Sequence, residues 1–154
     1  MTKRSAGILL FRRKPDLEVF LVHPGGPFWA KKDLGAWSIP KGEYAEGEEP
    51  LIAARREFEE ETGTALSGKF LALGEIKQAG GKIVDAWALE HDLDAAAVRS
   101  NTFEMEWPAR SGRMRAFPEI DRAAWFSVSA AAEKLIPAQA AFVVRLAEKM
   151  ATSG

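Results

Sequence analysis

The segment from Gly42 to Thr64 constrains the fold more than any other part of the chain, because a glycine-containing turn leads there into a short run rich in glutamate. Pro50 suits the first position of a helix, since its φ angle is already helical and its missing N–H costs no hydrogen bond there. Gly63 suits the left-handed residue that ends a helix. Together the two residues predict a helix of about four turns between them.

Three carboxylates share one face of this predicted helix. Glu57, Glu60 and Glu61 stand at i, i+3 and i+4, which brings their side chains within coordination distance of one another, while Glu59 points elsewhere. A neighbouring apolar stripe can dock on a core, and this leaves the carboxylates at the edge of a cleft. The stripe consists of Leu51, Ala54 and Phe58.

Charge repulsion on that face favours a bound cation. Like charges at this spacing cost roughly 0.2–0.5 kcal/mol per pair, and only Arg55 and Arg56 lie close enough along the helix to offset them. Mg²⁺ prefers oxygen ligands and usually shares its coordination shell with substrate phosphates. The alternative for the glutamates alone is a solvated acidic helix face, as in most charge runs.

The spacing of these residues resembles the signature of the Nudix hydrolases, which reads Gly, five residues, Glu, seven residues, then Arg-Glu-apolar-x-Glu-Glu-x-Gly-apolar. Thr64 departs from that signature, which has an aliphatic residue there, and we expect the change to affect packing rather than chemistry. The resemblance implies an α/β protein with the Nudix fold, an α/β/α sandwich with a mixed sheet. The matching positions are Gly42, Glu48, Arg56, Glu57, Phe58, Glu60, Glu61 and Gly63.

The same resemblance implies how these residues act. Mg²⁺, with Mn²⁺ as a substitute, would assist hydrolysis of a phosphoanhydride. Its protein ligands would be Glu57, Glu60 and Glu61, and the Gly42 carbonyl can complete the shell. Arg56 is a poor base because it does not deprotonate, so we expect it to hold a glutamate in position. Glu48 is expected to have an auxiliary role near the metal.

Family members often recruit one more carboxylate from a loop outside the signature, as a metal ligand or as the base that activates water. Glu119 is the candidate here. It lies six residues before Trp125, a spacing similar to that of the diadenosine polyphosphate hydrolases. Glu104 and Glu106 compete for this role, and each of the three acids is equally open to being a plain surface residue.

The segment from Trp37 to Gly42 resembles the W-x-x-P-K-G motif of the diadenosine polyphosphate branch, in which the lysine faces phosphate. Lys41 is therefore the predicted phosphate contact. Glu43 departs from the pattern, because a histidine commonly follows the motif. Tyr44 either stacks on a base or packs against the loop. Lys82 is a second candidate phosphate contact. Further candidates are the loop arginines, for which plain solvation is the alternative: Arg110, Arg113 and Arg115.

Aromatic residues offer stacking surfaces for a nucleobase, although we expect most of them to pack in the core. The two histidines, His23 and His91, have no second histidine at ligand spacing and are predicted to be structural or exposed. The aromatic candidates are Phe28, Trp29, Trp87, Phe103 and Trp107.

Composition predicts one compact cytoplasmic enzyme domain over residues 1–154. The chain is 47% hydrophobic, enough for a core, and its net charge of −1 argues against a stable nucleic-acid partner. It has no cysteine, so nothing requires an oxidising compartment, and its N-terminal apolar run is too short to span a membrane. A monomer or a homodimer is equally compatible with these properties.

Periodicity and turn residues predict a mixed sheet enclosed by helices. Strands are expected at residues 6–11, 19–23, 37–39, 70–76, 82–90 and 124–127, with one hairpin joining the first two through residues 12–16 and another at Gly80-Gly81. Residues 91–118 are expected to be irregular. Helices are expected at residues 129–135 and 138–150, separated by Pro137.

The leading functional hypothesis is Mg²⁺-dependent hydrolysis of a small nucleotide substrate, with dinucleoside polyphosphates such as diadenosine tetraphosphate as the favoured class. A nucleoside triphosphate pyrophosphohydrolase and an RNA 5′-end pyrophosphohydrolase are the alternatives within enzymes. A nucleotide sensor without turnover is the third reading, and the intact glutamates argue against it.

Overall fold

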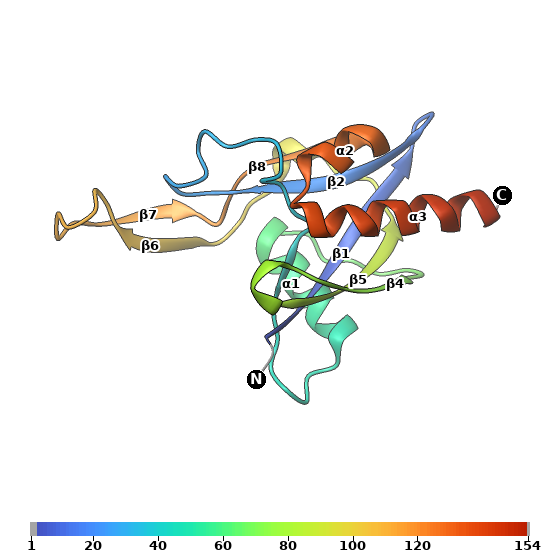
Figure 1. The fold of residues 1–154 in the computed structure, drawn as a ribbon, viewed down its shortest axis with the longest axis horizontal. Helices are drawn as coiled ribbons and strands as arrows, with labels where there is room; N and C mark the ends of the chain where they lie inside the picture. The colour runs from blue at the N-terminus through green and yellow to red at the C-terminus, as the bar shows by residue number, and fades with distance from the viewer. Residues whose placement is uncertain (1–2, 154) are drawn as a thin grey trace.

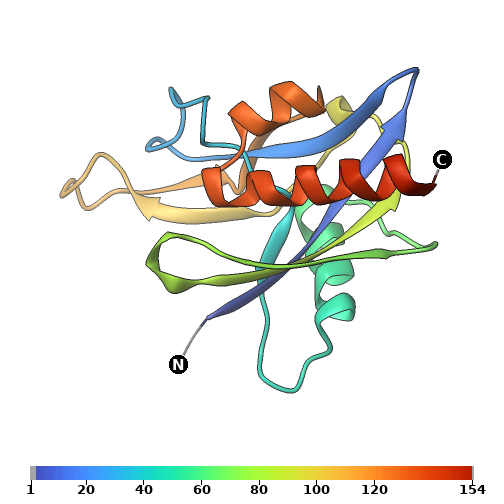
Figure 2. The ribbon, with the colours of Figure 1, turned by 45° about the vertical axis from the view of Figure 1, so that its right-hand side comes forward.

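A mixed β-sheet lies between one helix on one face and two helices on the other (Figures 1, 2) in the computed structural model, which describes residues 3–153. The strand order is β4-β5-β1-β2-β8, and β3 pairs with β1 beyond the end of β2. β1 and β5 run parallel, and the other pairs are antiparallel. The strands are β1 (Arg4–Arg13), β2 (Leu17–Pro24), β3 (Lys41–Glu43), β4 (Leu71–Lys77), β5 (Ile83–Glu90) and β8 (Ile120–Ser127).

Helix α1 (Pro50–Thr62) covers one face of this sheet, and α2 (Val128–Lys134) and α3 (Ala140–Ser153) cover the other (Figure 1). Two apolar cores result. The side chains of β1 alternate between them: Ile8 and Leu10 pack toward α1, while Leu9 and Phe11 pack toward α3. The predicted α/β/α sandwich is confirmed.

The bounds of α1 agree with the prediction. Pro50 is its first residue, and Gly63 follows it with a φ of 83°. The carboxylate of Glu49 caps the N-terminus by accepting hydrogen bonds from the backbone N–H groups of Leu51 and Ile52. Phe58 is fully buried, with its ring centroid 6.2 Å from that of Phe20 on β2.

The prediction of a strand at residues 37–39 is wrong. Trp37 and Ser38 form only isolated bridges, and the short strand in this region is β3, which begins at Lys41. The N–H of Ile39 donates to the side chain of Gln139 instead of to a neighbouring strand, and Pro40 has no N–H to donate. A ladder therefore cannot continue through this segment.

The prediction that residues 91–118 are irregular is also wrong. A hairpin of β6 (Thr102–Glu106) and β7 (Met114–Pro118) projects from the sheet (Figure 1). Its long connection lacks the two-residue turn that marks a hairpin in a sequence. Instead, the carboxylate of Glu106 organises that connection by accepting from the N–H groups of Arg110 and Gly112.

The other predicted elements are confirmed with shifted ends. The hairpins of β1 with β2 and of β4 with β5 form as expected, and the last strand begins at Ile120 rather than at residue 124. Short 3₁₀ turns lie at Ala79–Gly81, Ala95–Ala97 and Pro137–Gln139. Among the described residues, no helix is both long and apolar enough to cross a membrane.

We predict that Phe58→Ala lowers the free energy of unfolding by about 3–5 kcal/mol, because it opens a cavity between α1 and the sheet. Ile52→Ala on the same helix should change it by less than about 0.5 kcal/mol, since Ile52 is 59% exposed. Urea unfolding at equilibrium measures both. Equal losses for the two variants would show that α1 is not anchored through Phe58.

Candidate active site

The carboxylate face of α1 lies directly against the backbone of β3. A Cβ atom at Gly42 would come within 2.0 Å of Oε2 of Glu57, so a side chain at position 42 would have to displace that carboxylate. The backbone N–H of Lys41 donates to Oε2 of Glu61 at 3.0 Å. The structure thus brings together Gly42, Glu57 and Glu61, three of the four residues expected to be metal ligands.

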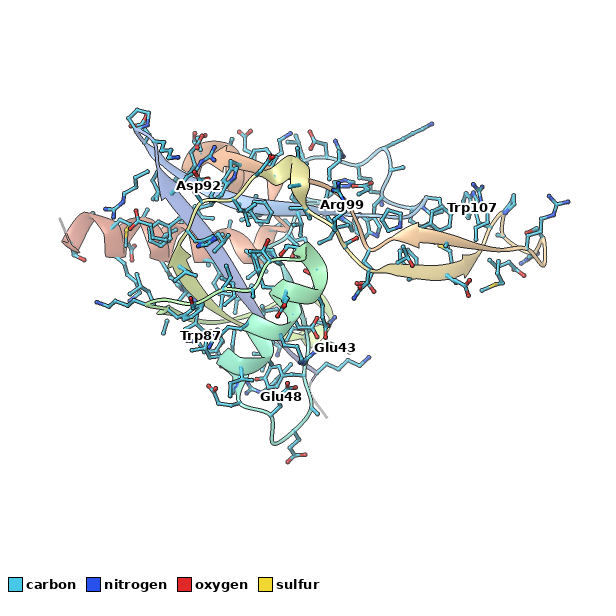
Figure 3. The ribbon with its side chains drawn as sticks, turned by 180° about the vertical axis from the view of Figure 1, so that it is seen from behind. Glu43, Glu48, Trp87, Asp92, Arg99 and Trp107 are labelled. Carbon is cyan, nitrogen blue, oxygen red and sulfur yellow. The ribbon has the colours of Figure 1, made fainter. Side chains whose placement is uncertain are left out.

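Arg56 links the acidic residues around this face. Its Nε and Nη2 donate to the two carboxylate oxygens of Glu48, each at 3.1 Å. Its Nη1 donates to Glu57 at 2.8 Å and to Glu60 at 3.3 Å. These contacts fit the predicted positioning role of Arg56, and Glu48 lies by the N-terminal end of α1 (Figure 3). The hydrogen bonds from Arg56 to Glu48 and Glu57 also raise the pKa of the guanidinium group.

Burial makes two of the glutamates weaker acids. It raises the pKa of Glu61 to about 8, and it also raises the pKa of Glu57. The negative charge of Glu119, which lines the same pocket as Glu61, adds to the rise in both cases. A cation at these carboxylates would favour their ionised forms.

Glu119 lies between β7 and β8 and lines a pocket of about 210 Å³ together with Lys41 and Glu61. Its backbone is fixed on both sides, because its N–H donates to the Asn101 carbonyl and its carbonyl accepts from the N–H of Gly25. The competing acids Glu104 and Glu106 lie exposed on β6. Of the three candidates, Glu119 is the one that the fold places beside the α1 carboxylates.

The predicted substrate contacts have different surroundings. Burial lowers the pKa of Lys41, and the neighbouring positive charge of Lys82 lowers it further. Nζ of Lys82 lies 3.6 Å from Oε1 of Glu43 and forms an ion pair with it. The hydroxyl of Tyr44 donates to Asp85 at 3.1 Å, and its ring packs against the apolar core beneath α1. The loop arginines Arg110, Arg113 and Arg115 are exposed on the hairpin.

Across residues 3–153, no three acidic, histidine or cysteine side chains are gathered closely enough to hold a metal ion. Arg56 bonds to both Glu57 and Glu60, and Glu61 bonds to the backbone of Lys41, so each carboxylate already has a partner. The donors are nevertheless all oxygens, as Mg²⁺ and Mn²⁺ prefer, and Gly42 keeps side-chain atoms away from Glu57. The donor chemistry therefore suits a divalent cation, which the three glutamates would have to approach one another to hold together.

The sequence predicts a cleft beside these carboxylates but does not identify most of the residues that wall the pocket found there. Its walls include Ile136, from the segment between α2 and α3, and Trp29, from the loop after β2. Trp29 stood out only as one aromatic residue among several, and nothing in the local pattern distinguishes a pocket wall from core. By contrast, Trp87 packs against the core, and His23 is fully buried, as a structural role predicts.

We predict that the metal-free protein loses stability as the pH rises from about 5 to 8. Over this range folded Glu61 keeps a proton that the unfolded chain has released, since its pKa rises from 4.5 to about 8 on folding. The slope contributed by this group approaches about 1 kcal/mol per pH unit. Urea unfolding in the presence of a chelator measures it, and Glu61→Gln should flatten the slope. An unchanged slope in the variant would contradict the assignment.

A sequence model of the NUDIX domain family matches residues 1–146. The RNA pyrophosphohydrolase of Caulobacter vibrioides is 40% identical over 57 residues, which cover 34% of this chain and 33% of that protein. The 8-oxo-(d)GTP phosphatase of Mycolicibacterium smegmatis is 28% identical over 148 residues, which cover 87% of this chain and 38% of that protein. The chain thus spans about a third of the length of the curated relatives that it matches.

Among solved structures, that of a C. elegans Ap4A hydrolase binary complex superposes on 96% of this chain and 98% of that chain, with a TM-score of 0.70 and 18% sequence identity. At this identity the likeness is one of fold. It confirms the expected Nudix architecture, and the match over residues 1–146 confirms the expected family. The chain belongs to the NUDIX domain family.

Proposed function

We propose that this chain is a divalent-metal-dependent hydrolase that cleaves a phosphoanhydride bond in a small nucleotide, with dinucleoside polyphosphates such as diadenosine tetraphosphate as the favoured class. One juxtaposition carries the proposal: Glu61 of α1, Lys41 and Glu119 line one pocket although they come from separate parts of the chain. Family membership supports hydrolase activity, and the motif from Trp37 to Gly42 supports the substrate class.

Glu57, Glu60 and Glu61 would hold Mg²⁺, with the Gly42 carbonyl as a further ligand. When bound, the ion neutralises charge on phosphate oxygens and lowers the pKa of a coordinated water. Arg56 maintains the spacing of the glutamates through its hydrogen bonds to Glu57 and Glu60. The ion would also relieve the cost of burying Glu57 and Glu61 as anions.

Two further groups act on the substrate and on the water. Lys41 lines the pocket with Glu61, so its ammonium group is placed to contact a phosphate oxygen close to the carboxylates. Glu119 lines the same pocket and would accept the proton of the attacking water. Because the Glu119 backbone is hydrogen-bonded on both sides, its carboxylate is presented from a fixed position.

Pyrophosphate release from a nucleoside triphosphate, or from the 5′ end of an RNA, is the second candidate function. The matched curated relatives favour it, since one is named an RNA pyrophosphohydrolase and the other an 8-oxo-(d)GTP phosphatase. The net charge of −1 favours a small nucleotide over a stable nucleic-acid partner. We further propose a cytoplasmic location, because a chain without cysteine needs no oxidising compartment.

A substrate panel with Mg²⁺ tests the proposed function. ATP plus AMP released from diadenosine tetraphosphate would support the favoured class, and pyrophosphate released from a triphosphate would support the second. In either case Glu57→Gln and Glu61→Gln should lower kcat/KM about a hundredfold or more, because they remove charge from the metal site. Glu59→Gln is the matched control, since Glu59 is exposed on the same helix. Tight nucleotide binding without turnover would overturn the proposal in favour of a sensor.

Glu119→Gln tests the assignment of the base. We expect kcat to fall about a hundredfold while KM changes little, as for the loss of a general base. Glu104→Gln is the control, since Glu104 is an exposed acid on β6. Initial rates across a Mg²⁺ titration measure both variants. Full activity of Glu119→Gln with unchanged metal dependence would remove Glu119 from the mechanism.

A further inference from the structure

The pocket beside Glu61 combines charged groups with an apolar body. Lys41, Glu61 and Glu119 supply its charged lining. Most of the remaining wall is hydrocarbon, from Val22, Ile39, Ile120 and Ile136, and Trp29 is the one aromatic residue among the described residues that line it. A ligand that fills this space must therefore present both anionic groups and an uncharged, apolar surface.

Trp29 is held in place by the loop that carries it. The backbone N–H of Trp29 donates to the Gly26 carbonyl, and its backbone carbonyl accepts from the backbone N–H of Lys32. The loop is tied to the sheet at both ends: the buried His23 ring approaches the Lys32 carbonyl at 2.6 Å, and the N–H of Gly25 donates to the Glu119 carbonyl at 2.9 Å. Although Trp29 is 37% exposed, its backbone is fixed relative to Glu119.

Backbone donors along the pocket already have partners. The N–H groups of Val22 and Ser38 donate to each other's carbonyls, and the N–H of Ile39 donates to Gln139. The N–H of Ile120 donates to the hydroxyl of Ser100. The hydroxyl of Ser38, which also lines the pocket, donates to the Ile39 carbonyl. These groups are therefore engaged and do not read the polar edge of a base.

We propose that Trp29 is a specificity-determining residue, whose indole stacks on the nucleobase of the substrate while Lys41 faces its phosphates. The proposal rests on the proposed function and names the part of the nucleotide that enters the pocket. Since the backbone donors are engaged, recognition depends on the face of the ring. The enzyme accepts different bases and favours purines, which have the larger stacking surface.

Binding measurements test this stacking without requiring turnover. In the presence of Mg²⁺, Trp29→Ala should weaken binding of ADP roughly ten- to a hundredfold and leave binding of ribose 5-diphosphate, which lacks a base, unchanged. Trp29→Phe should restore most of the affinity for ADP. Phe28→Ala is the matched control, because Phe28 is the neighbouring aromatic residue, 66% exposed and packed against Trp107 rather than lining the pocket.

Calorimetric titration distinguishes the outcomes. Equal weakening for ADP and for ribose 5-diphosphate, or no weakening for either, would overturn the role of Trp29 while leaving hydrolysis intact. Conversely, a wild-type protein that binds ADP through Trp29 yet hydrolyses no nucleotide would sink the proposed function alone. For turnover, kcat/KM for diadenosine tetraphosphate and diguanosine tetraphosphate should agree within about tenfold, whereas a preference of several thousandfold would indicate hydrogen-bonded readout of the base and contradict the stacking.

Discussion

The close contact between the β3 backbone and the carboxylate face of α1 is the constraint on which the site depends. Two glycines permit it. A Cβ atom at Gly42 would collide with Glu57, and one at Gly7 on β1 would come within 2.6 Å of the Pro40 carbonyl. Because β3 pairs with β1 next to Gly7 and α1 packs on the same strand through Phe58, one central strand sets the position of both. The carboxylates are therefore aligned by the core.

That alignment has an electrostatic consequence. Glu57 and Glu61 are drawn partly out of water, which raises the pKa of both, and the charge of Glu119 adds to the effect. Arg56 compensates Glu57 and Glu60 through hydrogen bonds, while Glu61 has the Lys41 amide as its partner. A site with partly buried carboxylates is suited to a divalent cation and to an anionic substrate held with it.

The apolar half of the site belongs to a different structural unit. The loop after β2 lies alongside the β6–β7 hairpin (Figures 1, 2), where Phe28 packs edge-on against Trp107 with ring centroids 5.9 Å apart. The Cζ atom of Phe103 lies close enough to Gly26 that a Cβ there would come within 2.9 Å of it. Glu119 follows the hairpin, and its carbonyl accepts from the N–H of Gly25 in the loop that carries Trp29. The candidate general base and the aromatic side of the pocket are therefore positioned together.

The sequence by itself determined α1, with its proline start, glycine stop and carboxylate spacing. Signals for helix ends are local, and the helical period of 3.6 residues places side chains at i, i+3 and i+4 on one face. It also determined the two hairpins of the main sheet. Only the tertiary structure decided that Lys41 and Glu119 flank Glu61, that Tyr44 packs inward, and that residues 102–118 form a hairpin. These features depend on contacts between residues far apart in the chain, and such contacts leave no periodic pattern in any one segment.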